Sequence, residues 1–191
     1  MSSARDALWF ATQADLEAWL GDNHERSPGA WIAIAKKGAS RPTVSYADAV
    51  ESALCFGWID GQKGRGDDEH WLQRFTPRSD RSRWSQINRD KAEKLIANGQ
   101  MRPRGLAEVE RARADGRWDS AYAGQRTATV PDDLQRELDD DPVAAAAFAA
   151  LNSANRYAII WRLNDAKRPE TRARRLADYL GMLRRGERLH D

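Results

Sequence analysis

The chain has 191 residues, a formal net charge of +2, 31% charged residues and one cysteine. A chain of this length can bury a substantial core, and a single thiol excludes an intramolecular disulfide. No apolar run approaches the roughly 18 residues that span a bilayer, and the N-terminus lacks the basic-then-apolar pattern of a secretory signal. We therefore expect a water-soluble cytoplasmic protein that does not insert into a membrane.

The first part of the chain predicts a mixture of helices and strands. Thr12 and Ser45 are suited to cap helices, because their hydroxyls can accept hydrogen bonds from free backbone N–H groups. The run of β-forming apolar residues from Trp31 is typical of a central strand. We expect helices over 12–20 and 46–56, a central strand over 31–36, and an antiparallel hairpin with arms 58–63 and 70–76 around a turn at 64–69.

The second part predicts helices alone. Pro131, Pro142 and Pro169 stand where helices begin, and the small polar stretch 123–130 is suited to a linker. Expected helices cover 86–98, 104–115, 131–140, 142–151, 154–165 and 169–185. The prediction is an α+β fold with a small antiparallel sheet, packed helices and an all-helical C-terminal region. Residues 1–125 would form an α+β domain with the candidate pocket, and 126–191 a helical extension.

Asp60 is the acidic residue that most suggests a site. It lies between Ile59 and Gly61 in a strand expected to be half buried, where a carboxylate needs a partner. Alternation puts it on one face with Trp58 and Gln62, and Arg74 or Arg78 is the expected partner. Asp60 could hold a cationic ligand or act as a general acid or base; the alternative is a structural ion pair.

The arginines that follow suggest an anion site. Arg74, Arg78, Arg81 and Arg83 lead into Trp84 and a helix that begins near Ser85. Arginine forks beside a helix N-terminus bind carboxylates or phosphates, although an exposed loop with solvated charges fits as well. The large rings either anchor the core or offer flat faces to a ligand. These rings are Trp58, Trp71, Trp84 and Trp118.

Other motifs favour structural roles. Cys55 has no histidine near it in sequence and is expected to be a buried, unreactive thiol. The single cysteine and three scattered histidines give no metal site, and we expect no cofactor. Gly61–Gly66 has the wrong glycine spacing for a phosphate loop. Lys167–Arg168 and Arg172–Arg175 favour a solvated or salt-bridged helix face over nucleic-acid binding, because an acidic run shares the same region.

Several stretches, taken in order, resemble the YdeI/OmpD-associated family. These are 31–38, 53–62, 74–78, 84–88, 116–118 and 167–175, which together cover nearly the whole chain. The resemblance implies bacteriocin protection, a phenotype of resistance to antimicrobial peptides with no defined reaction. The family's motif positions fall here on Trp58, Asp60, Gln62, Arg74, Thr76, Arg78, Trp84, Ser85 and Asn88.

The leading hypothesis is a cytoplasmic stress- or antimicrobial-resistance protein that binds a small molecule or peptide. Its pocket would lie around Asp60, Arg74, Arg78, Trp84 and Asn88. One alternative is an enzyme that uses Asp60 as acid or base and the arginines to stabilise negative charge. Another is an Arg-rich nucleic-acid-binding protein. The ligand and the oligomeric state are left open.

Overall fold

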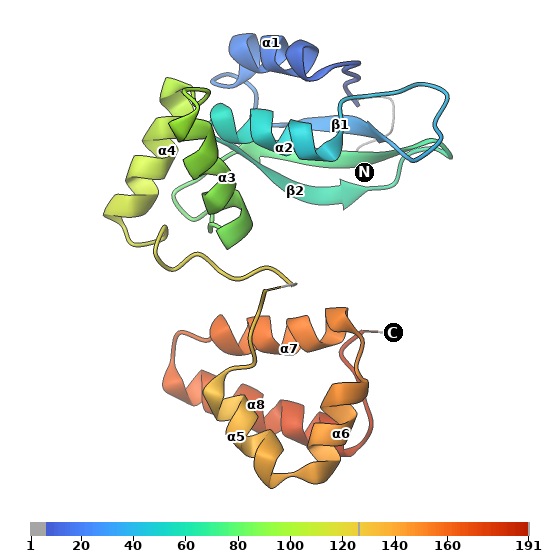
Figure 1. Cartoon of the computed structure of the whole chain (residues 1–191), viewed down its shortest axis with the longest axis vertical. Coiled ribbons are helices and arrows are strands. Elements are labelled where there is room, and N and C mark those ends of the chain that lie inside the picture. The colour runs from blue at the N-terminus through green and yellow to red at the C-terminus, as the bar shows by residue number, and fades with distance from the viewer. Residues whose placement is uncertain (1–6, 126, 191) are drawn as a thin grey trace. The chain divides into compact units, whose positions relative to one another are not determined.

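A computed structural model describes residues 7–125 and 127–190. The chain divides into two compact units, one extending to Tyr122 and the other beginning at Ala123. Figure 1 shows the N-terminal unit as a sheet with helices and the C-terminal unit as helices. The predicted α+β class with a helical C-terminal region is confirmed.

Local signals place the elements of the N-terminal unit. Thr12 forms a capping box with Asp15, and the Ser45 hydroxyl accepts a hydrogen bond from the Asp48 N–H, so both predicted caps are confirmed. In Figure 1, helices α1 and α2 cover one face of the sheet. The elements are α1 (Gln13–Asn23), β1 (Ala30–Ala35), α2 (Tyr46–Cys55), β2 (Trp58–Gly64), β3 (His70–Pro77), α3 (Gln86–Ala97) and α4 (Pro103–Ala114).

The sheet is antiparallel with the strand order β1-β3-β2. The prediction that 31–36 is a central strand is therefore wrong, because β3 is central. The apolar character of β1 reflects burial on both of its faces. Ile32 and Ile34 face the core, while Ala33, which points the opposite way, is also fully buried. A bridge between Leu8 and Ile32 covers part of the free edge of β1.

A β-bulge interrupts the hairpin. Asp60 pairs with Phe75, whereas the next pair along the ladder is Lys63 with Gln73, so the register shifts between them. Gly61 and Gln62 together lie opposite Arg74, so β2 has one extra residue in a bulge that breaks the alternation of side chains. Lys63 therefore takes the alternate position on the Asp60 face that alternation had predicted for Gln62.

The core of the N-terminal unit lies between the helices and the face of the sheet that carries Asp60 and Phe75. The largest side chains in it with almost no exposure are Trp58, Phe75 and Trp84, packed with Leu16 and Leu20 of α1. Gly57, with a φ of 73°, ends α2 and turns the chain directly into β2. This short connection places the start of β2 against the helix that precedes it.

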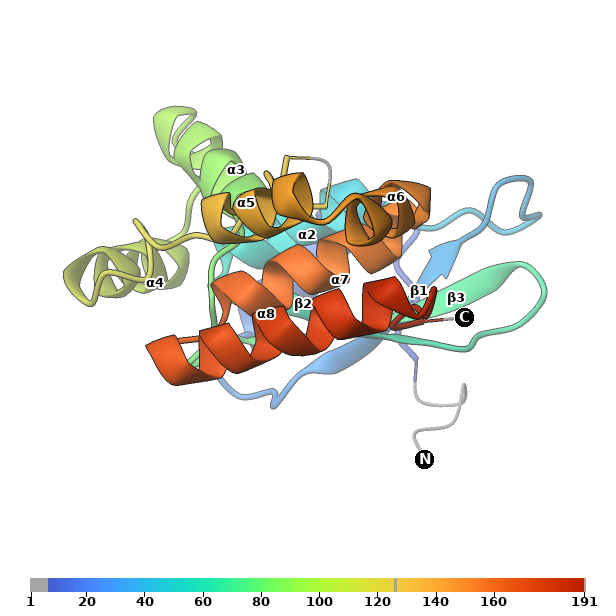
Figure 2. The same ribbon diagram turned by 90° about the horizontal axis from the view of Figure 1, so that it is seen from below.

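In the described part of the C-terminal unit, four helices surround a core of their own. These are α5 (Asp132–Asp140), α6 (Pro142–Ala150), α7 (Ser153–Asn164) and α8 (Pro169–Arg184). Leu134, Ile159 and Leu163 are fully buried between them, with Leu183 at 1% exposure. Figure 2 shows α7 and α8 running side by side. Among the described residues, no helix is both long and apolar enough to cross a membrane.

Candidate functional site

Asp60 is bound by a tyrosine. The Tyr46 hydroxyl, at the first residue of α2, donates a hydrogen bond of 2.6 Å to Asp60 Oδ2. Desolvation, the hydrogen bond and the negative charge of Asp60 together raise the pKa of Tyr46 above its ordinary value. The hydroxyl therefore stays protonated at neutral pH and donates to the carboxylate, although 39% of the tyrosine surface is exposed.

Arg78 is almost fully enclosed, with 3% of its surface exposed. Its guanidinium carbon lies 3.6 Å from the centre of the Trp84 ring, and Nη1 donates to the Arg83 carbonyl at 3.3 Å. Nε and Nη2, which form the other edge of the guanidinium, find no acceptor among the described residues. Burial lowers the pKa of Arg78 to about 10, so the side chain remains charged at neutral pH.

Trp84 continues this cluster into the core. Its ring packs edge-on against Trp118 with centroids 4.8 Å apart, and its buried Nε1 has no acceptor in the described part of the chain. The Trp84 carbonyl accepts a hydrogen bond from the Tyr122 N–H at 3.0 Å. The negative charges of Glu108 and Asp60 both favour the charged form of Arg78 and so oppose the lowering of its pKa by burial. We call Tyr46, Asp60, Arg78, Trp84 and Tyr122 the Arg78 cluster.

Arg74 and Thr76 do not join this cluster. They alternate with Phe75, the residue opposite Asp60, and so point to the other face of the sheet. The prediction that Arg74 forms an ion pair with Asp60 is therefore wrong. Arg74 instead lies beside Trp31, its cross-strand partner, at 6.0 Å from the ring centre. None of the salt bridges found within the described residues contains Asp60 or Arg78, so this alternative pairing is also absent there. Asp60 instead accepts the hydrogen bond from Tyr46.

The other predicted site residues, Trp58, Gln62, Ser85 and Asn88, lie in the core, in the bulge or at a helix start. Trp58 has 1% exposure and donates from Nε1 to the His24 carbonyl, as a core anchor does. Gln62 is exposed in the bulge. Ser85 caps α3 by accepting from the Asn88 N–H at 3.1 Å, which places both at the helix start directly after Trp84.

Sequence reasoning missed Tyr46 and Tyr122. Tyr46 lies on α2, beside the Trp71 ring with centroids 5.5 Å apart, and meets Asp60 only because α2 packs on β2. Tyr122 reaches the cluster through a single bridge to Ser85. The Ser45 cap predicts that α2 begins at Tyr46, but it does not predict that Tyr46 contacts Asp60. No local pattern indicates the position of Tyr122.

The lone thiol lies in the core of the N-terminal unit. Cys55 is free and 6% exposed, as expected for a buried thiol. Burial raises its pKa to about 11, which keeps it protonated at neutral pH. No group of three or more His, Cys, Asp or Glu side chains that could hold a metal ion is found in the described part of the chain.

In the C-terminal unit, two of the predicted surface arginines bind within the unit. Arg172 makes hydrogen bonds to both carboxylate oxygens of Asp133, at 2.6 and 2.7 Å, and to the Leu163 carbonyl at 2.6 Å. Arg175 donates to the Arg162 carbonyl at 2.5 Å. The salt-bridged alternative for this basic stretch therefore applies to Arg172.

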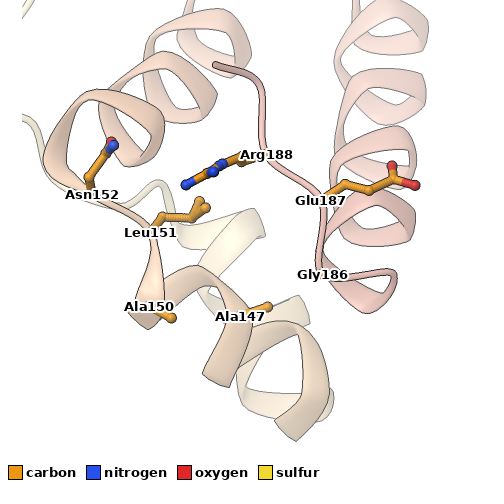
Figure 3. Close-up of a pocket in the computed structure, with 7 residues that line it drawn as sticks. All are labelled: Ala147, Ala150, Leu151, Asn152, Gly186, Glu187 and Arg188. Atoms are coloured by element: carbon orange, nitrogen blue, oxygen red, sulfur yellow. The ribbon is translucent and has the colours of Figure 1, made fainter. Parts of the chain in front are cut away.

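A pocket in the C-terminal unit lies between the end of α6 and the residues after α8. In Figure 3 the Arg188 side chain extends toward Leu151 and Asn152, whereas Glu187 points away. Small side chains form the rest of the lining. The lining residues are Ala147, Ala150, Leu151, Asn152, Gly186, Glu187 and Arg188.

Two family models match the chain. A domain of unknown function (DUF8412) matches residues 8–108, and the family described as bacteriocin-protection, YdeI or OmpD-associated matches residues 127–186. The second match contains the 167–175 motif, whereas most of the N-terminal motifs lie in the first. No curated protein and no solved structure matches the chain.

The first match covers more than half of the chain and holds every residue of the Arg78 cluster except Tyr122. The second covers most of the helical unit and only the C-terminal part of the chain. The chain therefore belongs to the family defined by this domain of unknown function, and its C-terminal part is of the bacteriocin-protection, YdeI or OmpD-associated type.

Proposed function

We propose that this protein is a cytoplasmic stress- or antimicrobial-resistance protein that binds a small molecule or peptide at the Arg78 cluster. The match of the C-terminal part to a bacteriocin-protection family supports a resistance role. In this proposal Arg78 holds an anionic group of the ligand, Asp60 holds a cationic or hydrogen-bonding group, and Trp84 contacts the apolar body. This division of roles is usual for ligand sites.

One observation carries the proposal. Two stacked side chains, Arg78 and Trp84, leave three buried donors without an acceptor among the described residues: Nε and Nη2 of Arg78 and Nε1 of Trp84. Each buried donor left unpaired destabilises a fold by about 1–3 kcal/mol, so such groups are rare unless they have a further partner. The Nε and Nη2 edge of arginine is also the edge that binds a carboxylate or phosphate through two parallel hydrogen bonds.

The test is a thermal-shift screen of the full chain against antimicrobial peptides and metabolites. A ligand that binds only the folded state raises apparent stability, by about 2.7 kcal/mol at a concentration 100 times its Kd. We expect Arg78→Met and Asp60→Asn to abolish a genuine shift. Arg78→Lys keeps the positive charge but loses the paired N–H donors of the guanidinium. We expect it to reduce the thermal shift without removing it.

Arg74→Met is the matched control, because Arg74 lies in β3 with its side chain on the face of the sheet away from Asp60. A shift lost with Arg74→Met but kept with Arg78→Met would contradict the proposed site. A ligand found in this way is then tested for turnover, which separates binding from the enzyme alternative.

A further inference from the structure

A second surface of the N-terminal unit carries a cationic groove that the Arg78 cluster does not include. It lies between the segment that follows β1 and the hairpin of β2 and β3, and its volume is about 740 Å³. Part of the Gly61–Gly66 stretch, which has the wrong spacing for a phosphate loop, forms one wall. The lining residues are Ala35, Lys36, Lys37, Lys63, Gly64, Arg65, Gly66, Asp67, Asp68, His70 and Trp71.

Four cations line this groove: Lys36, Lys37, Lys63 and Arg65. Lys36 Nζ donates to the backbone carbonyls of Asp67 at 2.8 Å and Asp68 at 3.2 Å. These acceptors are neutral, so they hold Lys36 across the groove without cancelling its charge. None of the salt bridges found within the described residues involves any of the four cations.

The two acids of the lining do not balance these charges. The Asp67 carboxylate points back into the hairpin, where it accepts hydrogen bonds from the Glu69 N–H, the His70 N–H and His70 Nδ1 at 2.9, 2.6 and 3.1 Å. Asp68 is the other acid. Counted over the Lys, Arg and Asp side chains of the lining, four cations and two acids leave a net charge of +2 in the groove, which concentrates anions there.

The groove also presents an aromatic ring. Trp71 is only partly buried, and Lys63 Nζ lies 4.3 Å from its ring centre. Flat indole faces next to Lys and Arg side chains are the combination that holds a nucleobase by stacking and its phosphates by charge. Lys37 and Arg65 are exposed and unoccupied by any salt bridge in the described residues, so they are available to phosphate oxygens.

We propose that this groove binds a nucleoside polyphosphate. Its phosphates lie against Lys36, Lys37 and Arg65, and its base stacks on Trp71 in place of the exposed Lys63 ammonium, which swings aside. Recognition in this site comes from side-chain cations and a ring, whereas a phosphate loop uses the backbone amides of a helix start. The groove lining includes none of the Arg78 cluster residues, although Trp71 contacts Tyr46 of that cluster. The charge-reversal variants at Lys37 and Arg65 therefore separate the two proposals more cleanly than Trp71→Leu does.

The test is isothermal titration of the full chain with ATP, adenosine and inorganic tripolyphosphate at ~20 mM and ~150 mM salt. We expect saturable ATP binding that weakens with salt, and ATP binding tighter than either fragment. Lys37→Glu with Arg65→Glu reverses two exposed charges, and we expect this double variant to weaken ATP binding at least about tenfold. Lys94→Glu, an exposed lysine of α3 outside the groove, is the control and should change affinity less than about twofold.

Trp71→Leu tests the base contact, and we expect it to reduce ATP binding to the level of tripolyphosphate. Three results would overturn the proposal: no saturable binding of ATP at low salt, equal weakening by Lys94→Glu and the double variant, or tripolyphosphate binding as tightly as ATP to the unmodified protein. Arg78→Met should leave ATP binding unchanged, so failure at one site is distinguishable from failure at the other.

Discussion

Replacing Arg78 with methionine tests how its charge is accommodated in the unliganded protein. Methionine keeps an unbranched chain that can lie on the Trp84 ring but removes the charge and all donors. Burial lowers the pKa of Arg78 from 12.5 to about 10. The difference of about 2.5 pKa units corresponds to about 3 kcal/mol, at about 1.4 kcal/mol per unit. Removing the charge relieves this unfavourable free energy.

The substitution also removes favourable contacts. The hydrogen bond from Nη1 to the Arg83 carbonyl is worth about 1.5–3 kcal/mol, and the stacking of the cation on Trp84 about 1–2 kcal/mol. These losses and the relieved desolvation nearly cancel. The lost contacts sum to about 2.5–5 kcal/mol against about 3 kcal/mol relieved, so we expect Arg78→Met to lower the free energy of unfolding by no more than about 2 kcal/mol. A buried cation with all its partners in place would instead lose about 3–5 kcal/mol.

Urea unfolding followed by tryptophan fluorescence measures this difference in buffer without added carboxylate or phosphate. Arg74→Met is again the control; this arginine is only partly buried, and we expect a change within about 0.5 kcal/mol. If Arg78→Met lowered the free energy of unfolding by about 3 kcal/mol or more at an unchanged denaturant slope, Arg78 would be fully partnered. Nε and Nη2 of Arg78 would then already have partners in the protein and would not be free to bind a ligand.

Three further predictions concern packing and titration. A Cβ at Gly105 would lie 2.3 Å from the Cys55 carbonyl oxygen, whereas one at Gly21 of α1 meets nothing within 4 Å. Gly105→Ala should therefore destabilise by about 2 kcal/mol or more and Gly21→Ala stabilise by about 1 kcal/mol, as thermal unfolding will show. Burial raises the pKa of Cys55 to about 11, so a thiol reagent at about pH 8 should react far more slowly with the folded chain than in urea; equal rates would contradict this. The hydrogen bond from Arg172 lowers the pKa of Asp133 below its ordinary value. The ionised Asp133 therefore stabilises the fold at pH values above its unfolded pKa, and this stabilisation is lost as pH falls through its folded pKa. In Asp133→Asn, the free energy of unfolding should fall less steeply between about pH 5 and pH 2 than in the unmodified protein.

The sequence by itself determined the local elements. Thr12 and Ser45 capped the helices that they were expected to cap, and Gly57 ended α2 in the positive-φ conformation that glycine adopts most easily. The hairpin arms and the helices of the C-terminal part were also predicted close to their observed bounds. These features depend on residues within a few positions of one another, so a linear pattern contains the information for them.

The tertiary structure decided which residues meet. The bulge at Gly61 and Gln62 set the hairpin register, and that register put Arg74 on the face away from Asp60. Tyr46 and Asp60 are 14 positions apart in sequence, and they meet because α2 packs on β2. Arg78 lies on Trp84 because the turn at Ser79–Ser82 brings the two together, and one edge of its guanidinium has no acceptor in the described part of the chain. Pairings of this kind follow from the simultaneous burial of apolar surface on several elements, and no short stretch of sequence contains that information.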